Sequence, residues 1–520
     1  MDVIKLDAVC SISEVLADAA RRAPQQVALR ASDGERNYAA LNEAASRIAA
    51  ALKASGVETQ QRVGFLGANS ATSVELMFGA LRAAAVWTPL NWRLSRDVLQ
   101  QVVAETDMVL LFVDPAFTEV AAALTNCHGK RLRTICVSGD GEFHAWCALG
   151  QAGEFALKSD PDNIAVQIYT SGTSGVPKGV MLSHGALLAS RRMERQVGEP
   201  WSNWKPGEVN MVCMPNFHVS GALSVIAGVV NLGCTILLPQ FEVKTVLNVL
   251  RTTPPMRLLL VPSAIKLMLD DPRSADVDFS AVRYVMYGGS PMPEPLMREI
   301  LERMKCEFVQ FYGMTETSGR ATYLPPASHC PGPGQRLASA GKPFPGVKLE
   351  IREEGGKKLL SGEIGEICVK SSSVMSGYWA RPDATASALD DGWYRTGDVG
   401  YLDGDGFLFV VDRLNDKIVT GGENVYPSEV EGALRSHPAV ADAAVCALPD
   451  PRWIEAIHAA VILKPEASIS EAELRAWVSE RIGSYKSPKR TVFVPAFPRG
   501  ATGKVLRKDL SAMIVRLLAA

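Results

Sequence analysis

The stretch YTSGTSGVPKG, residues 169–179, says most about the fold and the chemistry of this chain. It follows an apolar run at residues 164–169 that predicts a buried strand, and residue 183 onward predicts a helix. A glycine-rich loop after a strand can turn several backbone N–H groups toward one anion, and its hydroxyls and lysine add donors and positive charge. The stretch therefore predicts phosphate binding, with a flexible surface loop as the alternative. It is not a Walker A loop, because Pro177 precedes Lys178 and Gly179 stands where that motif needs Ser or Thr.

Length and composition narrow the class of protein. A chain of 520 residues predicts two or more domains. The net charge of −2 does not indicate binding to nucleic acid or to an anionic membrane. The ten cysteines include no CxxC pair, which argues against zinc fingers and disulfide frameworks. The N-terminus has no apolar leader, so we expect a cytoplasmic protein without a secretory signal.

The pattern between residues 60 and 320 predicts an α/β architecture. Short apolar runs alternate there with amphipathic segments, as in helices packed on largely parallel sheets. The uncharged stretch 219–238 is interpreted as a buried helix followed by a buried strand, not as a membrane span. The predicted strands are 62–66, 108–113, 211–214, 258–261, 284–287 and 307–311, and residues 293–305 form a helix between the last two.

After residue 343 the sequence pattern predicts short strands and tight turns, and residues 403–406 predict a hairpin turn. A boundary is predicted near residues 412–416. Beyond it lies a unit of small-domain size. Its predicted elements are helices at 428–436 and 470–482, strands at 440–448, 456–463 and 491–494, and a terminal helix.

A series of further motifs follows the phosphate loop in a fixed order. They are PNFH ending at His218, YGGSP from Tyr287, YGMTE at 312–316, YRTGD ending at Asp398, DR at 412–413, GGENVYP at 421–427 and PRGATGK at 498–504. Over nearly the whole chain this series resembles the adenylate-forming superfamily of acyl-CoA synthetases, peptide-synthetase adenylation domains and luciferases. The chain is most similar to the bacterial fatty-acyl-CoA synthetases, judging by PLNWRL at 89–94 and GGENVYPSEVE from residue 421.

The resemblance implies an α/β fold with a large N-terminal domain, a hinge and a small α+β C-terminal domain that rotates. The N-terminal domain, residues 1–412, would hold stacked α/β sheets and a distorted β-barrel-like part. Residues 413–416 would form the hinge, and residues 417–520 the domain with the catalytic lysine. The family's pivot residue is normally Asp or Lys, and Asn415 stands there in this chain. Asn tolerates unusual backbone angles, so the expected rotation is retained.

The resemblance also implies the reaction. An acid and Mg-ATP would form an acyl-adenylate and pyrophosphate, and the acyl group would then pass to coenzyme A with release of AMP. Since an ionised carboxylate, with a pKa near ~4, is already a nucleophile, positioning and charge neutralisation are expected to carry the catalysis. The expected cofactors are ATP, Mg²⁺ and coenzyme A.

Roles for single residues follow from the resemblance. The expected catalytic residues are Lys504, Glu316, His218 and Thr170, with Glu316 and Thr170 as metal ligands. Lys504 would contact both the substrate carboxylate and the α-phosphate, and residues 421–422 would meet the pantetheine of coenzyme A. The expected nucleotide and coenzyme contacts are Thr170, Ser171, Gly172, Thr173, Ser174, Gly175, Lys178, Gly288, Gly289, Ser290, Gln310, Phe311, Tyr312, Gly313, Met314, Thr315, Asp398, Arg413, Gly421 and Gly422.

The acid is less well specified than the reaction. Amino-acid-activating relatives place an aspartate at the position of His218, so His218 argues for an acid without an α-amine. Phe311 stands where long-pocket relatives often carry glycine. A medium- or long-chain fatty acid is the first prediction, and an aryl or cinnamate-type acid is the alternative.

Other functions are weighed against the same residues. A non-catalytic nucleotide sensor is disfavoured, because Lys504 and Glu316 are both present. A carrier-loading module would need a downstream domain, and the sequence ends at Ala520. Luciferase activity stays open by motif.

No nucleic-acid partner and no transmembrane segment are expected, while a homodimer and peripheral membrane contact stay open. Arg191, Arg192 and Arg195 lie on one predicted helix, where a solvated face is favoured over a membrane patch. Lys504 also resembles a site of regulatory acetylation, which would neutralise its charge.

Overall fold

The computed structural model describes residues 3–128, 132–137, 141–150, 160–170, 177–290, 292–330, 332, 335–416, 418–420, 423–451, 454–499 and 505–519. The fold is mixed α/β, with a large N-terminal domain of sheets and a smaller C-terminal domain, as predicted. Its contacts divide the chain into two compact units. Unit 1 comprises Met1–Leu349 and Val369–Arg395, and unit 2 comprises Glu350–Cys368 and Thr396–Ala520.

One sheet of unit 1 has the strand order β15-β14-β13-β12-β11-β9-β10-β1-β2. The strands from β13 to β1 are parallel, and β14, β15 and β2 are antiparallel to their neighbours. The strands are β1 (Val27–Ala31), β2 (Gly34–Asn37), β9 (Val209–Val212), β10 (Cys234–Leu237), β11 (Arg257–Leu260), β12 (Tyr284–Gly288), β13 (Glu307–Tyr312), β14 (Thr322–Leu324) and β15 (Lys342–Pro343).

A second sheet of unit 1 has the order β18-β8-β7-β4-β3-β5-β6. Its central strands are parallel, while β7, β8 and β18 pair antiparallel. Its strands are β3 (Arg62–Leu66), β4 (Val86–Pro89), β5 (Met108–Val113), β6 (Arg133–Cys136), β7 (Ile164–Thr170), β8 (Lys178–Ser183) and β18 (Gly377–Tyr378).

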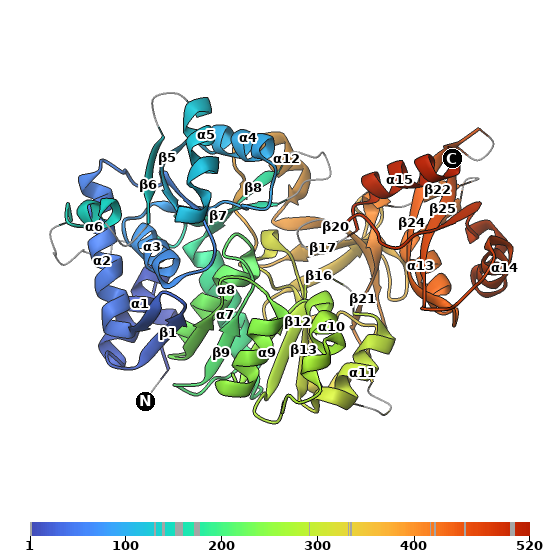
Figure 1. Cartoon of the computed structure of the whole chain (residues 1–520), viewed down its shortest axis with the longest axis horizontal. Helices are drawn as coiled ribbons and strands as arrows, with labels where there is room; N and C mark the ends of the chain where they lie inside the picture. The colour runs from blue at the N-terminus through green and yellow to red at the C-terminus, as the bar shows by residue number, and fades with distance from the viewer. Residues whose placement is uncertain are drawn as a thin grey trace. The chain divides into compact units, whose positions relative to one another are not determined.

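Helices bury apolar stripes against these sheets. Figure 1 shows α9, α10 and α11 beside β12 and β13, where their Leu, Ile and Met side chains share one core. The helices of unit 1 are α1 (Ile12–Arg22), α2 (Tyr38–Ala54), α3 (Ala71–Arg82), α4 (Arg96–Thr106), α5 (Thr118–His128), α6 (Glu142–Cys147), α7 (His184–Gln196), α8 (Val219–Val230), α9 (Val243–Thr252), α10 (Pro262–Asp270), α11 (Glu294–Met304) and α12 (Pro382–Ala388).

A smaller curled sheet has the order β16-β17-β20-β19, with β21 paired to β20, and is the predicted barrel-like part. The predicted hairpin at 403–406 joins β20 and β21, which confirms that interpretation. The strands are β16 (Lys348–Arg352), β17 (Gly365–Lys370), β19 (Leu389–Asp390), β20 (Trp393–Leu402) and β21 (Leu408–Arg413).

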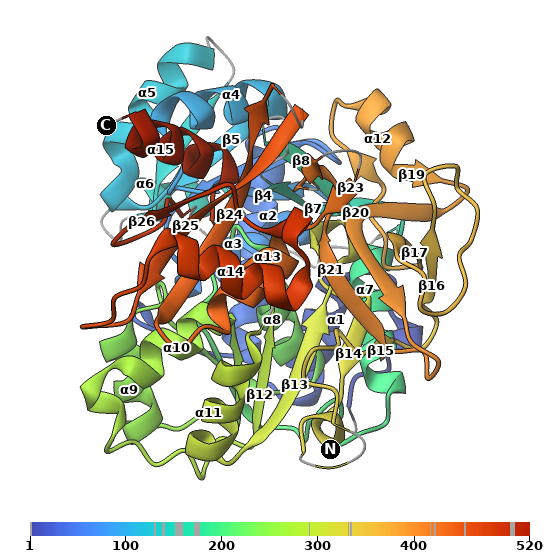
Figure 2. The same ribbon diagram turned by 90° about the vertical axis from the view of Figure 1, so that its right-hand side faces the viewer.

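The C-terminal part of unit 2 has a sheet with the order β23-β22-β25-β24, and β26 pairs with β25. Helices α13 and α14 pack on one face, and α15 packs on the other, because alternate residues of β24 and β25 enter two separate cores (Figure 2). The elements are β22 (Ile418–Thr420), β23 (Glu423–Val425), α13 (Pro427–Arg435), β24 (Val440–Asp450), β25 (Ile454–Leu463), α14 (Glu471–Ile482), β26 (Arg490–Phe493) and α15 (Arg507–Ala519).

The phosphate-loop interpretation needs one correction. The sequence predicts a strand, a loop and then a helix, but β8 lies between the loop and α7 and pairs antiparallel with β7. The loop therefore closes a hairpin. Its lysine was assigned to the loop, although Lys178 is the first residue of a strand.

The arginines of α7 also require a correction. Arg191 is 2% exposed and pairs with Glu194 at 2.9 Å. Arg192 donates to the carbonyl of Leu6 at 2.7 Å, and Arg195 donates to the carbonyl of Val230 at 2.7 Å. These side chains fasten α7 to neighbouring segments, so they form neither a solvated face nor a membrane patch.

The uncharged stretch 219–238 forms the buried helix α8 and the buried strand β10, as predicted. Among the described residues, no helix is long and apolar enough to cross a membrane.

Candidate active site

The hairpin of β7 and β8 presents the two ends of the predicted phosphate loop side by side. Thr170 and Lys178 are register partners, while residues 171–176 lie outside the described part of the chain. An added Cβ on Gly179 would lie 2.8 Å from Gln167 Nε2, so a side chain there would displace the buried amide of Gln167. The hydroxyl of Tyr169 lies 2.7 Å from Thr106 Oγ1, and burial raises the pKa of Tyr169 to about 12. Strand pairing and buried side-chain hydrogen bonds thus hold the base of the loop, and Lys178 begins its second strand.

Tyr378 connects Lys178 with Glu316. It lies on β18, opposite Val180 of β8. The ammonium nitrogen of Lys178 lies 5.0 Å from the centre of the Tyr378 ring, within range of a cation–π interaction. The Tyr378 hydroxyl donates to Glu316 Oε1 at 3.0 Å, and Glu316 is buried, 9% exposed. A cation and an acid therefore both contact one tyrosine, the cation at its ring and the acid at its hydroxyl.

The turn that carries Glu316 is anchored on two sides. It is a 3₁₀ turn, Thr315–Thr317, which follows β13. Ser190 Oγ of α7 donates to the carbonyl of Ser318 at 3.2 Å, and Ser318 Oγ donates to the carbonyl of Ser373 at 2.8 Å. The N–H of Met375 donates to the carbonyl of Glu316 at 2.8 Å. These bonds hold the carboxylate in place from both the helix and the segment before β18.

The predicted adenine-binding segments lie at the carboxyl ends of two parallel strands, β12 and β13, which is where open α/β sheets bind ligands. An added Cβ on Gly288 would lie 2.3 Å from the carbonyl oxygen of Phe311, so only glycine fits there. An added Cβ on Gly313 would lie 2.7 Å from the backbone nitrogen of Arg320. Gly289, Ser290, Gln310, Tyr312, Met314 and Thr315 lie in the same two segments and are not fully buried.

Behind these segments lies a buried neutral pair. The Tyr287 hydroxyl lies 2.9 Å from His329 Nε2 and 3.3 Å from Gln310 Oε1. Burial lowers the pKa of His329 to about 4, so the imidazole is neutral near pH 7. The side chain of Gln310 therefore accepts its hydrogen bond from the neutral hydroxyl of Tyr287.

His218 is the residue before α8 and is half-buried, with its ring 4.7 Å from that of Phe217. A cavity of about 20 Å³ lies beside this turn. Its lining is mostly apolar and includes Met77, Val212, Met214, Ala222, Val225 and Leu237.

Phe311 is the second-last residue of β13, and its side chain is buried. Its ring lies 4.4 Å from the guanidinium of Arg320 and 5.8 Å from the ring of Trp201. Arg320 is itself paired with Glu194 at 2.9 Å. Phe311 is therefore fixed by a cation and an aromatic ring.

In unit 2 the structure brings Asp398 and Arg413 together. They are register partners on β20 and β21, and Arg413 Nε lies 2.6 Å from Asp398 Oδ1. The Asp398 side chain is only 6% exposed, whereas that of Arg413 is 48% exposed. An acid buried to this degree and paired at this distance is unlike an ordinary surface ion pair.

The predicted site residues fall partly outside the described part of the chain. Ser171, Gly172, Thr173, Ser174, Gly175, Gly421, Gly422 and Lys504 lie outside the described residues. The backbone of Asn415 lies in the 3₁₀ turn Leu414–Asp416. Before this turn, Ser428 of α13 donates its N–H to Asp412 Oδ2 at 2.8 Å and its hydroxyl to the carbonyl of Val411 at 2.5 Å.

Tyr378 was missed by sequence reasoning. It lies in the run SGYW, which carries no acid, base or phosphate-binding pattern. Its position depends on the pairing of β18 with β8, and two-residue edge strands leave no periodic signal.

Comparison with known proteins identifies the family of this chain. Residues 16–379 match the family model of the AMP-binding enzyme, and residues 429–504 match that of the AMP-binding enzyme C-terminal domain. A fatty acid–acyl-carrier-protein ligase of Streptomyces coeruleorubidus is 37% identical over 91% of this chain and 90% of its own length. An indoleacetate–CoA ligase of Aromatoleum aromaticum is 34% identical over 95% of this chain and 96% of its own length.

The ATP-bound structure of MatB from Rhodopseudomonas palustris has a TM-score of 0.86 at 28% identity, covering 96% of this chain and 98% of that one. The o-succinylbenzoate–CoA synthetase of Bacillus subtilis in complex with its acyl-adenylate has a TM-score of 0.84 at 30% identity, covering 95% and 97%. This chain belongs to the AMP-binding enzyme family, the adenylate-forming superfamily, and is an acid–thiol ligase of the acyl-CoA synthetase type.

Proposed function

We propose that this enzyme activates a medium- or long-chain fatty acid with ATP and transfers the acyl group to coenzyme A. In the first half-reaction a carboxylate oxygen attacks the α-phosphorus, the bond from the α-phosphorus to the α,β-bridging oxygen breaks, and pyrophosphate leaves. In the second, the coenzyme A thiol loses its proton and attacks the acyl carbon, and AMP leaves. The observation that carries this proposal is that Tyr378, beside the hairpin of β7 and β8, contacts both Lys178 and Glu316.

The groups of unit 1 fit the nucleotide. Lys178 and the loop from Thr170 to Gly175 would bind the β- and γ-phosphates, and their positive charge would stabilise the leaving pyrophosphate. The segments 288–290 and 310–315 would bind the adenine, with Tyr312 stacked on its face.

Glu316 and Thr170 fit Mg²⁺. The Glu316 carboxylate is buried and oriented by Tyr378, and carboxylate and hydroxyl oxygens are the hard ligands that this ion prefers. When bound, Mg²⁺ would supply positive charge to the phosphate oxygens.

The groups of unit 2 fit the ribose and the second half-reaction. Asp398 would accept hydrogen bonds from the ribose hydroxyls, and Arg413 would bind beside it. Lys504 would neutralise the carboxylate and the α-phosphate during adenylation. Residues 421–422 would approach coenzyme A after residues 417–520 rotate relative to residues 1–412, with Asn415 of the hinge 413–416 as the pivot.

One observation supports a fatty acid. The similar proteins include a fatty acid–acyl-carrier-protein ligase and a long-chain fatty acid–CoA ligase of Mycobacterium tuberculosis. An aryl or cinnamate-type acid is the second candidate, favoured by the similar indoleacetate–CoA ligase and a feruloyl-CoA synthase.

A screen of pyrophosphate release over acids of graded chain length and aromaticity tests the proposal. Each acid is assayed alone, with coenzyme A, and with a carrier protein bearing phosphopantetheine, since one similar protein is a carrier-protein ligase. We expect the highest kcat/KM for an aliphatic acid with a medium or long chain, and its thioester with coenzyme A. Preference for an aryl acid by about tenfold, or ~1.4 kcal/mol, would contradict the fatty-acid assignment.

A further inference from the structure

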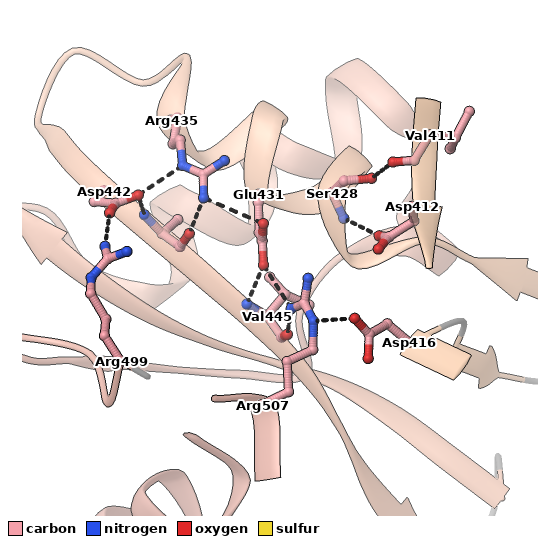
Figure 3. A network of polar contacts seen from close by, with 11 residues as sticks. Val411, Asp412, Asp416, Ser428, Glu431, Arg435, Asp442, Val445, Arg499 and Arg507 are labelled. Atoms are coloured by element: carbon pink, nitrogen blue, oxygen red, sulfur yellow. Dashed lines mark hydrogen bonds and ion pairs between the residues drawn. The ribbon is translucent and has the colours of Figure 1, made fainter. Parts of the chain in front are cut away.

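Arg507 lies at the centre of a polar network in unit 2 (Figure 3). It is the first residue of α15 and follows Lys504 by three positions. Its Nη1 lies 2.8 Å from Glu431 Oε1 of α13 and also donates to the carbonyl of Val445 on β24. Its Nε lies 3.1 Å from Asp416 Oδ2, in the turn that holds Asn415. One guanidinium thus joins a helix, a strand and the segment of the expected pivot.

The network holds the other end of the Lys504 segment as well. Arg499 Nη2 lies 2.9 Å from Asp442 Oδ2, and Asp442 Oδ1 lies 2.8 Å from Arg435 Nε. Arg435 in turn lies 3.3 Å from Glu431 Oε2, so Glu431 is shared by both ends. Arg499 and Val505, which flank the undescribed residues 500–504, form an antiparallel bridge.

The charge and burial of Arg507 and its partners suit a guanidinium that holds several acceptors at once. The Arg507 side chain is 25% exposed and that of Glu431 is 11% exposed. Burial alone would lower the pKa of Arg507, but Glu431 and Asp416 outweigh it and raise the pKa. A planar guanidinium can hold two carboxylates and a carbonyl in fixed directions, whereas a lysine ammonium acts as a point charge.

We infer that Arg507 is a positioning residue for the adenylation half-reaction, which ties the segment carrying Lys504 to the segment carrying Asn415. Asp416 and the segment that follows Lys504 then stay together with α13 and β24 on one side of the pivot. This inference rests on the proposed role of Lys504. Arg507 does not contact the substrate, so it acts by orienting a group that does.

The test compares Arg507→Met and Arg507→Lys with the unchanged enzyme in the two half-reactions. ATP–pyrophosphate exchange reports adenylation, and thioester formation from a preformed acyl-adenylate reports transfer. For Arg507→Met we expect kcat of exchange to fall about tenfold or more, with the KM for ATP and the transfer rate within about twofold. Arg507→Lys should lose about threefold, because it keeps the charge without the fork.

Arg475→Met is the matched control. Arg475 of α14 is 47% exposed, pairs with Glu471 at 3.6 Å and donates to the carbonyl of Pro488 at 3.0 Å, outside the network. Its loss should leave the ratio of the two half-reactions unchanged. If Arg507→Met does not fold, Asp416→Asn takes its place, because it weakens one contact of the fork. Asp416→Asn should lower exchange about threefold without lowering transfer.

Equal loss in both half-reactions, or no loss in the folded variants, would overturn the inference. Lys504→Ala is assayed in parallel to separate it from the proposed function. If Lys504→Ala retains adenylation, the proposed role of the lysine fails and the inference fails with it. If Lys504→Ala loses adenylation while Arg507→Met and Asp416→Asn keep it, only the positioning role is wrong.

Discussion

The two units hold polar groups in different ways. In unit 1 two buried groups have neutral partners: the Glu316 carboxylate accepts from Tyr378, and His184 Nδ1 accepts from the N–H of Ile12 at 3.3 Å. In unit 2 the polar groups form ion pairs with at least one partly exposed side chain, such as Arg413–Asp398 and Arg507–Asp416. Buried contacts to neutral partners respond to protonation, whereas partly exposed ion pairs are also weakened by salt. We therefore expect acid to act mainly on unit 1 and salt mainly on unit 2.

Removing the charge of Glu316 should have the largest effect on unit 1. Glu316→Gln keeps an oxygen that can accept from Tyr378 but loses the negative charge for Mg²⁺. We expect ATP–pyrophosphate exchange to fall by about 1000-fold. Glu307→Gln, at the start of β13 and 48% exposed, is the control and should keep normal exchange. A loss below about tenfold in Glu316→Gln would remove Glu316 from the metal site.

Acid should destabilise unit 1 through His184. Burial lowers the pKa of His184 to about 4. Because the unfolded chain takes up the proton near pH ~6.5 and the folded one does not, stability should fall between about pH 6.5 and 4, by on the order of 3 kcal/mol. His184→Gln keeps an acceptor for Ile12 and should reduce this dependence by about half in urea unfolding measured at several pH values, because His329, whose pKa burial also lowers to about 4, makes a similar contribution. The same pH dependence in enzyme and variant would show that His184 is not the titrating group.

Fixing the backbone at Asn415 should slow thioester formation and leave adenylation unchanged. Proline locks φ near −65°, so Asn415→Pro should adenylate normally but form the thioester about 100-fold more slowly, an effect of ~2.7 kcal/mol. Rapid-quench measurement of acyl-adenylate and thioester separates the two steps. Unimpaired thioester formation would exclude Asn415 as the pivot.

Loss of the Tyr378 hydroxyl should have the smallest effect. Tyr378→Phe keeps the ring beside Lys178 but removes the hydrogen bond to Glu316. A bond to a charged group is worth about 1.5–3 kcal/mol, so exchange should fall at least about tenfold and the Mg²⁺ requirement should rise. Thioester formation from a preformed acyl-adenylate serves as the internal control. An unchanged Mg²⁺ dependence would show that Tyr378 does not orient the metal ligand.

The sequence predicts most of the fold because long apolar runs carry it. Residues 62–66 and 108–113 form β3 and β5 with the predicted bounds, since each run is apolar apart from Arg62 and follows a polar residue. Strand β9 begins at Val209, two residues before the prediction, because its first residues pair with β10 and β11 regardless of their polarity. Such pairing is set by distant strands and leaves no local pattern.

The candidate site is predictable where motifs carry it and not where tertiary contacts do. The pairing of Asp398 and Arg413 follows from a hairpin whose turn is visible in the sequence. The link between Lys178 and Glu316 depends on Tyr378, which reaches the site through an edge strand. The basic face of α7 was misread because its partners include carbonyls of Leu6 and Val230, which helical periodicity cannot reveal.

The most direct test of the account is the behaviour of Lys504→Ala in the two half-reactions. Adenylation, measured by ATP–pyrophosphate exchange with the preferred acid, should fall by about 1000-fold or more. Transfer from a preformed acyl-adenylate to coenzyme A should stay within about tenfold of the unchanged enzyme. Equal loss of both half-reactions would contradict the proposed role of Lys504 in adenylation alone.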